Sequence, residues 1–503
     1  MAILLIILTL LFPSLSWADP VHYAASCART DVNSAISGAH NGDTVSIPSG
    51  SACNWAGVGG KLAISNKPLS IIGSGVGNTI IQNGGFTWYF MNNSGQIRIS
   101  GIEFQCSNLA AVDLWSFPPY TITPIVDNNK FDAGSGVGCE ANINGDISSS
   151  GGVITKNTFI AGSGSTIRHL RQPTDAGNYG FDSGYASWAA DTNLGGVAGI
   201  VVAEGNTITW ATPGSYSAFD GRSGSRIVMR YNNITNQMWG MHDQMEGHEY
   251  STRQWEFYKN DIRYTVDTWL YPILVVGGTG VVWGNRTRAV DFTYGSDSPT
   301  LLLKVYRSWV SIAAPFYQCD NTTEKFCAGG VSGLACTADE DCTGSWHGAN
   351  YTPPCAQVDG QSDSSGYPCR GALGRGKRNA TTGMEAAEPA VFWDNLTCFA
   401  PGANCTPTEQ GEIFIEAPNH TQSNRDYCTG ATKPTECPTG TAWSYTPLSC
   451  PHPLAVSVVG LTGTCGDEAG VDGYNIEEEE GQGAIINPTI GPGSIQGLGI
   501  MVQ

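Results

Sequence analysis

Basic residues are scarce in this chain of 503 residues. It has 25 lysines and arginines against 44 aspartates and glutamates, a formal net charge of −19 at pH 7. This acidity argues against nucleic acid as a partner, and it suits a polyanionic sugar poorly unless local basic residues or a bridging cation offset it. Long amphipathic runs are also lacking, whereas glycine is abundant at 64 residues. The composition therefore predicts an all-β, turn-rich protein.

Apolar runs of membrane length are lacking as well. The opening segment MAILLIILTLLFPSLSWADP has an apolar core from Ile3 to Phe12, which is short for a bilayer span. Ser16, Trp17 and Ala18 then form a small-x-small cleavage pattern. We expect residues 1–18 to be a secretory signal peptide that is cut after Ala18. The mature chain should be secreted and should have no membrane span.

The distribution of the sixteen cysteines fits an exported protein. Four precede residue 140 and twelve lie between Cys319 and Cys465. No paired C-x-x-C spacing indicates zinc, so we expect disulfides. The stretch CDNTTEKFCAGGVSGLACTADEDC lacks apolar periodicity, and it begins a predicted disulfide-stapled insertion over residues 319–378.

A repeat centred on asparagine determines the predicted fold. The segments IVDNNKF, VITKNTF, VAEGNTI, VMRYNNI, EFYKNDI and VVWGNRT align on one position. The aligned residues are Asn129, Asn157, Asn206, Asn232, Asn260 and Asn285. The usual spacing is 25 to 28 residues, and the interval of 49 between Asn157 and Asn206 is close to two periods. Such a period indicates stacked coils.

The residues that flank each asparagine keep the same register. The third residue before it is apolar throughout, from Val126 to Val282, and the second residue after it is apolar from Phe131 to Ile262. Apolar residues at equivalent places indicate rungs that share one core. Each asparagine should occupy a tight turn between two strands, where it tolerates the left-handed conformation and its amide can bond along the stack.

Both ends of the repeat carry further signals. Residues 30–50 predict a short helix capped by Thr30 or Asp31 and then a strand, and this helix would cover the open end of the coil. Cys27 and Cys53 flank it and should pair. After the insertion, AVFWDNLT restores the pattern at Asn395. We therefore expect the β-helix over residues 19–318 and resumed rungs with disulfide-tied loops over residues 379–503.

The GDTVSIPSG opening, the coil length and the asparagine turns resemble a right-handed parallel β-helix of the pectin-lyase-like superfamily. The resemblance covers about residues 28–310. It implies that the asparagine turn lies between the second and third strands of a rung. It also implies that the outer face of the first strand carries the chemistry. Lyases, hydrolases, phage depolymerases and adhesins share this fold, so the activity stays open.

The resemblance places candidate site residues on the first strands. Ten residues after Asn232 comes His242, with Asp243 beside it. The equivalent segments STIRHLR and SAFDGRSG would bring further side chains to the same side of the solenoid, namely Arg168, His169, Arg171, Asp220 and Arg222. Tyr185 and Trp188, within the long interval, could form a platform on which sugar rings stack, or could belong to an extra rung with an ordered loop.

The second strand of the charged segment RQWEFYKND shows one anomaly. Strand alternation points Trp255 and Phe257 inward and leaves Glu256 and Tyr258 outside. Glu256 occupies a column that otherwise holds isoleucine and valine, so it needs a partner, which Arg253 or Arg230 could supply. Glu256 is either part of a structural ion pair or a functional carboxylate, and Tyr258 is a candidate for substrate binding.

Three functions remain open on these residues. A polysaccharide lyase would use His242 as the base and Arg222 or Arg253 to stabilise the developing charge. A glycoside hydrolase would use Asp220 and Asp243 as a carboxylate pair. A non-catalytic glycan-binding or adhesin-like β-helix would need neither. We expect no cofactor and no metal, because no calcium-carboxylate cluster or zinc motif is evident; calcium remains the alternative. The sugar and the oligomeric state are open.

Overall fold

The fold comes from a computed structural model, and residues 20–478 are described with gaps. The described ranges are 20–56, 60–105, 110–117, 119–134, 142–146, 151–161, 166–171, 191–195, 200–210, 217–221, 224–241, 252–265, 272–275, 277–290, 301–305, 325–327, 344–346, 349–351, 355–357, 373–378, 385–415, 421–437, 443–467, 469–470, 473–474 and 476–478. The predicted signal peptide and most of the predicted insertion lie outside these residues.

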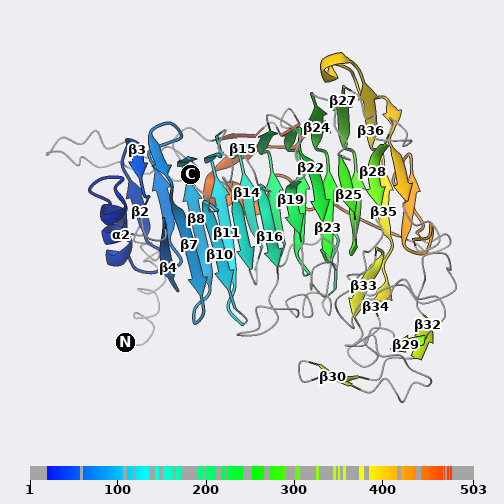
Figure 1. The fold of residues 1–503 in the computed structure, drawn as a ribbon, viewed down its shortest axis with the longest axis horizontal. Helices are drawn as coiled ribbons and strands as arrows, with labels where there is room; N and C mark the ends of the chain where they lie inside the picture. Colours follow the sequence, from blue (N-terminus) through cyan, green and yellow to red (C-terminus); the bar gives the residue numbers. More distant parts are fainter. Residues whose placement is uncertain are drawn as a thin grey trace, which may run out of the picture.

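Three long sheets run side by side along the molecule and enclose one core (Figure 1). Within the described residues, sheets A, B and C have 12, 11 and 10 strands. From β2 to β28, successive strands of the chain belong to different sheets, so each coil passes through A, B and C in turn. Neighbouring strands are parallel, except that the last strand of sheet B is antiparallel. The prediction of an all-β parallel β-helix is confirmed.

The strands of sheet A are β1 (Val21–Tyr23), β2 (Thr44–Ile47), β5 (Ser70–Gly73), β8 (Gly95–Ser100), β11 (Ile122–Asp127), β14 (Gly152–Thr155), β17 (Val201–Glu204), β20 (Arg226–Arg230), β23 (Gln254–Tyr258), β26 (Thr279–Trp283), β35 (Ala390–Trp393) and β39 (Tyr427–Gly430). Those of sheet B are β3 (Gly50–Asn54), β6 (Thr79–Gln82), β9 (Glu103–Gln105), β12 (Lys130–Asp132), β15 (Thr158–Ala161), β18 (Thr207–Trp210), β21 (Asn233–Thr235), β24 (Asp261–Tyr264), β27 (Arg286–Ala289), β36 (Leu396–Phe399) and β37 (Glu409–Gln410).

The strands of sheet C are β4 (Lys61–Ser65), β7 (Gly85–Phe90), β10 (Val112–Ser116), β13 (Ile143–Asp146), β16 (Ile167–Arg171), β19 (Ser217–Gly221), β22 (Met238–Met241), β25 (Ile273–Val275), β28 (Leu301–Val305) and β38 (Glu412–Ile415). Two-stranded antiparallel sheets lie outside the solenoid: β29 (Lys325–Cys327) with β32 (Cys355–Gln357), β30 (Gly344–Trp346) with β31 (Ala349–Tyr351), β33 (Arg375–Arg378) with β34 (Glu385–Ala387), and β40 (Leu461–Gly463) with β41 (Ile476–Glu478). The helical elements are α2 (Arg29–Gly38), η3 (Pro401–Ala403) and η4 (Ala455–Val459).

The predicted asparagine repeat forms a buried ladder between sheets A and B. The amide nitrogen of each ladder asparagine donates to the amide oxygen of the next one, as between Asn157 and Asn206 at 3.1 Å and between Asn206 and Asn232 at 3.0 Å. Asn285 bonds in the same way to Asn395 at 2.9 Å, although 110 residues separate them. Asn395 thus continues the ladder, and β35 pairs with β26 of the preceding rung.

Two details of the ladder differ from the sequence prediction. The left-handed residue is the one that precedes each asparagine, for example Lys156 (φ 52°) and Tyr231 (φ 54°). At one of these positions, Gly205 (φ 62°), a Cβ would also lie 2.3 Å from the ring of Tyr474, so only glycine fits. In addition, the direct bond from Asn157 to Asn206 makes the 49-residue interval a single rung. Its extra length lies between β16 and β17.

We expect Asn206→Ala to lower the free energy of unfolding by about 2–3 kcal/mol, because it leaves buried amide and carbonyl groups without partners. Asn206 accepts from the backbone nitrogen of Asn157 at 3.0 Å and donates to the carbonyl of Ile154 at 2.8 Å. Urea unfolding measures the change. Thr158→Ala, on the exposed side of β15, is the control and should change stability by less than about 0.5 kcal/mol. Equal effects of both variants would contradict a structural role of the ladder.

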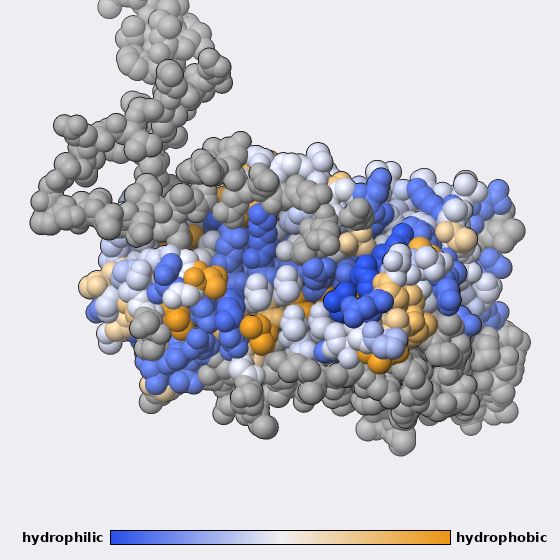
Figure 2. Space-filling model, turned by 90° about the horizontal axis from the view of Figure 1, so that it is seen from above, coloured by the Kyte–Doolittle hydropathy of each residue, from blue (hydrophilic) through white to orange (hydrophobic). Residues whose placement is uncertain are grey.

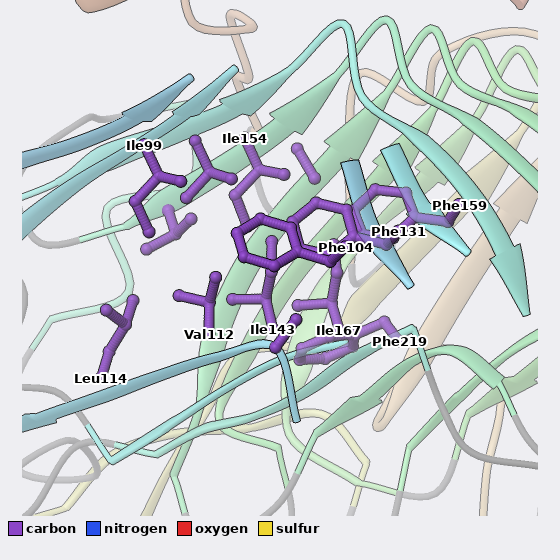
Figure 3. Packing of buried hydrophobic residues seen from close by; sticks show 14 of the residues in the cluster. Ile99, Phe104, Val112, Leu114, Phe131, Ile143, Ile154, Phe159, Ile167 and Phe219 are labelled. Carbon is purple, nitrogen blue, oxygen red and sulfur yellow. The ribbon is translucent and has the colours of Figure 1, made fainter. Parts of the chain in front are cut away.

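The core consists of the inward side chains of all three sheets. Phe104, Phe131 and Phe159 form a stack from rung to rung, with ring centroids 5.2 and 4.7 Å apart (Figure 3). Phe131 and Phe159 are the predicted positions two residues after a ladder asparagine, and Trp255 and Phe257 also point inward as predicted. Side chains at equivalent positions thus fill one continuous interior.

The N-terminal end of the core is covered by α2, as expected. Val32 and Ile36 are its buried residues. The N-cap is Ala28, without a side-chain cap, so the prediction of Thr30 or Asp31 as the cap is wrong. Asp31 instead lies in the first turn and accepts a hydrogen bond from Ser26 at 2.5 Å. The predicted disulfide between Cys27 and Cys53 is present.

The C-terminal segment, residues 443–474, packs on the outside of sheet A. Its apolar residues cover an outward column that begins at Ile125 and Val153. The described residues include three further disulfides in this half of the chain, Cys398–Cys405, Cys428–Cys437 and Cys450–Cys465. Within the described part of the chain, no helix combines the length and the apolar character needed to cross a bilayer.

Candidate functional site

A polar column crosses the outer face of sheet C. Asp113, Asn144, Arg168 and Asp220 are paired in register on β10, β13, β16 and β19. The Asn144 amide donates to Asp113 Oδ1 at 3.2 Å, and Arg168 Nε lies 3.8 Å from Asp220 Oδ2. Lys61 on β4 forms an ion pair with Asp113. The predicted neighbours Arg168 and Asp220 are thus brought together on adjacent rungs.

Two aromatic rings lie beside this column. Tyr89 on β7 and Trp115 on β10 are register partners, and their half-buried rings are stacked with centroids 6.4 Å apart and an interplanar angle of 20°. Trp115 is two residues from Asp113, so both face the same side of the sheet. An aromatic surface next to charged and amide groups is the arrangement that binds a sugar ring by stacking and hydrogen bonding.

The register of sheet C is interrupted at this column. The pairing of β13 with β16 shifts after Asn144, and the pairing of β19 with β22 shifts between Ser217 and Phe219. A bulge changes the direction of the side chains beside it, and bulges are frequent next to active sites. Both irregularities flank the pair formed by Arg168 and Asp220.

Long connections begin at the carboxyl ends of sheet C strands. They follow β16, β22 and β28, and because the strands are parallel they all leave from one edge of the sheet. Most of the predicted site residues lie at this edge by sequence. His242 and Asp243 directly follow β22, Arg222 follows β19, and Tyr185 and Trp188 belong to the connection after β16. These five residues, and the side chains of His169 and Arg171, lie outside the described residues.

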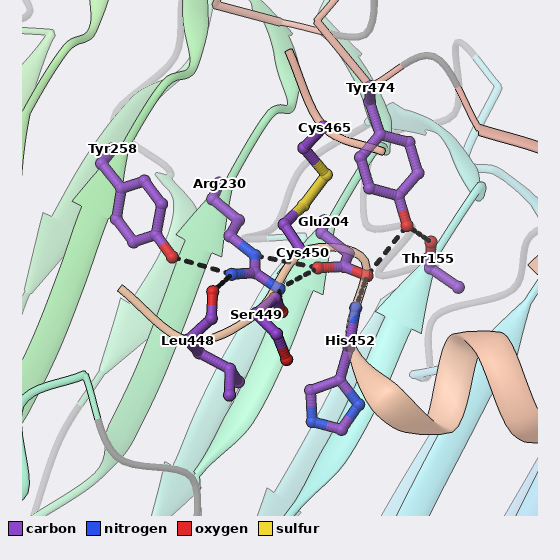
Figure 4. Close-up of a disulfide and its surroundings, with 10 residues drawn as sticks. All are labelled: Thr155, Glu204, Arg230, Tyr258, Leu448, Ser449, Cys450, His452, Cys465 and Tyr474. Carbon is purple, nitrogen blue, oxygen red and sulfur yellow. Dashed lines mark hydrogen bonds and ion pairs between the residues drawn. A yellow bond between two sulfur atoms is a disulfide. The ribbon is translucent and has the colours of Figure 1, made fainter. Parts of the chain in front are cut away.

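The remaining predicted residues lie in or next to sheet A, whose outer face is covered here by the C-terminal segment. Arg230 on β20 and Glu204 on β17 form a fully buried ion pair at 2.7 Å (Figure 4). Arg230 also donates to the carbonyls of Leu448 at 2.6 Å and Ser449 at 2.7 Å. These bonds fix the covering segment to the solenoid. Sheet A therefore offers a packed interface at this place rather than an accessible surface.

The buried Glu204 carboxylate accepts two further hydrogen bonds. Glu204 Oε1 accepts from the Tyr474 hydroxyl and from the His452 backbone nitrogen, each at 2.8 Å. Burial lowers the pKa of His452 to about 4, against the opposing effect of Glu204, so its ring is neutral at pH 7. Tyr258, a predicted substrate-binding residue, is 1% exposed and accepts from Arg230 at 2.9 Å.

Glu256 and Arg253 have partners other than the expected ones. Glu256 is 1% exposed and accepts from the Tyr445 hydroxyl at 2.5 Å and the Gly195 backbone nitrogen at 2.7 Å. Arg253 is buried just before β23, with Nη2 3.7 Å from Glu388. Our expectation that Arg253 or Arg230 would pair with Glu256 is wrong, because Tyr445 of the covering segment supplies the hydrogen bond and Arg230 pairs with Glu204. Glu256 and Asp220 are on different sheets.

Burial raises the pKa of Glu256, with the hydrogen bonds from Tyr445 and Gly195 acting in the opposite direction. The folded protein thus binds this proton more tightly than the unfolded chain does. The contribution of Glu256 to stability is greatest at low pH and is lost as the pH rises through its folded pKa. We expect Glu256→Gln to raise the unfolding temperature at pH 8 and to change it little at pH 4.

Thermal unfolding at both pH values measures this difference. Glu412→Gln is the control, because it removes the same charge from an exposed position on β38. It should have little effect at either pH. Stabilisation of the two variants to the same extent at pH 8 would contradict the role of burial.

Sheet B presents a third face, along the top in Figure 1. Seen from above, the molecule is mostly hydrophilic, with apolar residues in small separate groups (Figure 2). Its polar residues form ion pairs among themselves, such as Lys130 with Glu103 at 3.1 Å and with Asp132 at 2.9 Å.

A cavity of about 390 Å³ lies at the C-terminal end of the core and is lined by residues that include Phe392, Tyr427 and the ladder residue Asn395. It continues the interior and has no charged lining residue.

No family model matches this chain, and comparisons with curated proteins and with solved structures likewise found no significant match. The parallel β-helix is therefore established by the strand topology itself.

The sequence contained signals for features that we did not predict. Tyr89 and Trp115 are 26 residues apart, which is one coil, so the stacked pair follows from the period. Asp113 and Asn144 belong to rungs that lie before the segments we aligned for the first strand. Apart from Glu256, the outward column from Ile125 to Val281 is apolar. Apolar residues on the solvent side of a strand are the pattern of a face that another segment covers.

Proposed function

We propose that this protein is a secreted carbohydrate-active enzyme of the pectin-lyase-like type, which cleaves a polysaccharide by β-elimination on the outer face of sheet C. The observation that carries the proposal is the column from Asp113 to Asp220 beside the stacked Tyr89 and Trp115. Charged groups, an amide and an aromatic surface on one face meet the needs of a sugar ligand. The disulfides support export.

In the proposed reaction, His242 removes the proton α to a uronate carboxylate. The electron pair forms the new carbon–carbon double bond, the glycosidic C–O bond breaks, and the leaving oxygen takes up a proton. Imidazole suits this task because it is neutral near pH 7. Arg222 stabilises the enolate-like charge, and Arg168 binds the substrate carboxylate. Arg253, the other stabiliser expected from the sequence, is fully buried next to Glu388 and does not suit this role. On this face Lys61 balances the charge of Asp113 and Arg168 balances that of Asp220.

A glycoside hydrolase remains the alternative enzyme, with Asp220 and Asp243 as its carboxylates. Asp113 could not replace Asp243 as the second carboxylate of a hydrolase. It is three rungs from Asp220, roughly 14 Å at the usual strand spacing, whereas hydrolase carboxylates lie about 5–10 Å apart. A glycan-binding module without catalysis is favoured by one observation, the stacked aromatic pair, and would use the same face.

The test is a screen of the full mature chain against acidic and neutral polysaccharides. A lyase releases products with a new double bond, detected by ultraviolet absorbance and by a mass 18 Da below that of the hydrolysis product, as loss of water requires. Saturated products with new reducing ends would replace the proposal with the hydrolase. Retention on a glycan without any cleavage would replace it with the binding module.

A further inference from the structure

Three potential metal ligands meet at the N-terminal end of the solenoid, away from sheet C. His22 lies in the middle of β1, His40 follows α2, and Asp43 precedes β2. His22 Nε2 is 2.8 Å and His40 Nδ1 is 3.6 Å from Asp43 Oδ2, and the three ligand atoms lie within 4.8 Å of one another. None of the three is among the site residues predicted from the sequence.

The backbone holds these residues in place. Asp43 Oδ2 accepts from the His40 backbone nitrogen at 2.7 Å, and the Asp43 nitrogen donates to the His40 carbonyl at 3.2 Å, so the two residues close one turn. The Asp43 carbonyl accepts from Ser70 of the next rung at 3.0 Å. β1 pairs with β2 such that His22 lies beside Val45. The Asp43 carboxylate and the backbone of His40 are therefore positioned by the fold before any ion binds.

Burial differs across the three residues in the way that a metal site requires. The side chain of Asp43 is 5% exposed, that of His22 is 27% exposed and that of His40 is 87% exposed. The carboxylate is thus the anchored ligand, and the side of the exposed imidazole is open to solvent. An ion can enter from that side, and water can complete its coordination.

We propose that His22, His40 and Asp43 bind one divalent transition-metal ion, with zinc as the best fit. Ligand atoms around tetrahedral zinc lie about 2.0–2.1 Å from the ion and therefore roughly 3.3 Å from each other. The distances of 2.8 and 3.6 Å from Asp43 Oδ2 bracket that value. Two imidazoles and one carboxylate favour zinc over calcium, which prefers a shell of oxygen ligands.

The bound ion would tie together three parts of the N-terminal cap: β1, the end of α2 and the start of β2. β1 is the outermost strand of sheet A, with exposed Val21 and Tyr23. Because an unfolded chain does not hold the three ligands together, zinc should bind the folded protein preferentially and raise its unfolding temperature. This role is independent of the proposed cleavage of a polysaccharide.

The test is calorimetric titration of the full mature chain, after treatment with EDTA and its removal, with ZnCl₂ and separately with CaCl₂. We expect one zinc ion per chain and no matching calcium binding. His40→Ala should weaken zinc binding at least ~10-fold. It should leave the unfolding temperature in EDTA unchanged, because the imidazole is exposed.

Asn41→Ala is the matched control, an exposed neighbour outside the ligand set, and it should retain full affinity. Asp43→Asn should also lose zinc, and comparison with His40→Ala separates metal loss from damage to the turn. Absence of zinc binding would overturn the proposal, and so would equal affinity of His40→Ala and the parent chain. Neither result bears on polysaccharide cleavage, which is measured separately.

Discussion

Replacement of Arg230 by methionine is expected to lower the free energy of unfolding by about 3–5 kcal/mol, the usual cost of removing one partner from a buried ion pair. Arg230 and Glu204 are both fully buried. Without the guanidinium, the Glu204 carboxylate stays desolvated, and the carbonyls of Leu448 and Ser449 lose their donor. Urea unfolding measures the loss, and limited proteolysis should show earlier cleavage of the C-terminal segment.

Arg288→Met is the control for this variant. Arg288 forms an ion pair with Asp261 on sheet B, and both side chains are about one quarter exposed, 25% and 24%. We expect a change below about 1 kcal/mol, because exposed ion pairs contribute little. The double variant Glu204→Leu with Arg230→Met should regain part of the lost stability, since no charge remains buried. An Arg230→Met effect no larger than that of Arg288→Met would refute the anchoring role.

The second large effect concerns catalysis. If the chain cleaves a uronate polysaccharide, His242→Ala is expected to lower kcat by about 10²–10⁴-fold, the usual contribution of a general base. The rate of the parent chain should rise as increasing pH removes the proton from the imidazole, because the imidazole must be neutral to accept the substrate proton. Initial rates of product absorbance measure both. A variant with full activity would exclude His242 as the base.

Loss of stacking on Tyr89 and Trp115 should change KM rather than kcat. Trp115→Ala removes a stacking surface that binds substrate and transition state alike, so we expect KM to rise while kcat changes little. Tyr23→Ala, which truncates an aromatic residue that is 63% exposed on the first strand, is the control and should leave both constants unchanged. A loss confined to kcat in Trp115→Ala would contradict the stacking role.

Most of the fold could be predicted from the asparagine repeat. A ladder asparagine is buried, must be hydrogen-bonded and recurs once per coil, so its spacing reveals the stack directly. The same rule located Asn395 after 110 residues of unrelated sequence. The interval between Asn157 and Asn206 misled us, because the sequence alone does not distinguish an added rung from a long connection within one rung.

The candidate site could be predicted only in part. Residues such as Arg168 and Asp220 meet because their strands stack, and the period predicts this. Glu256 and Tyr258 were placed on the correct face, but Glu256 bonds to Tyr445 and Tyr258 belongs to a buried cluster with Leu448, about 190 residues later. Contacts of that sequence separation leave no local pattern. The only sign of these contacts in the sequence was the apolar column on the outer face of sheet A, which indicates that some segment covers the sheet but not which one.

The link from Asn285 to Asn395 has a consequence for how this chain can change. The ladder bond and the strand pairing of β26 with β35 are kept whatever the length of chain between them. The cost of closing a loop grows only slowly with its length. The corner between sheets C and A is therefore a place where segments can be inserted, exchanged or removed without disturbing the coil. New binding specificities can arise there by grafting of loops, and the same corner suits the display of a foreign peptide.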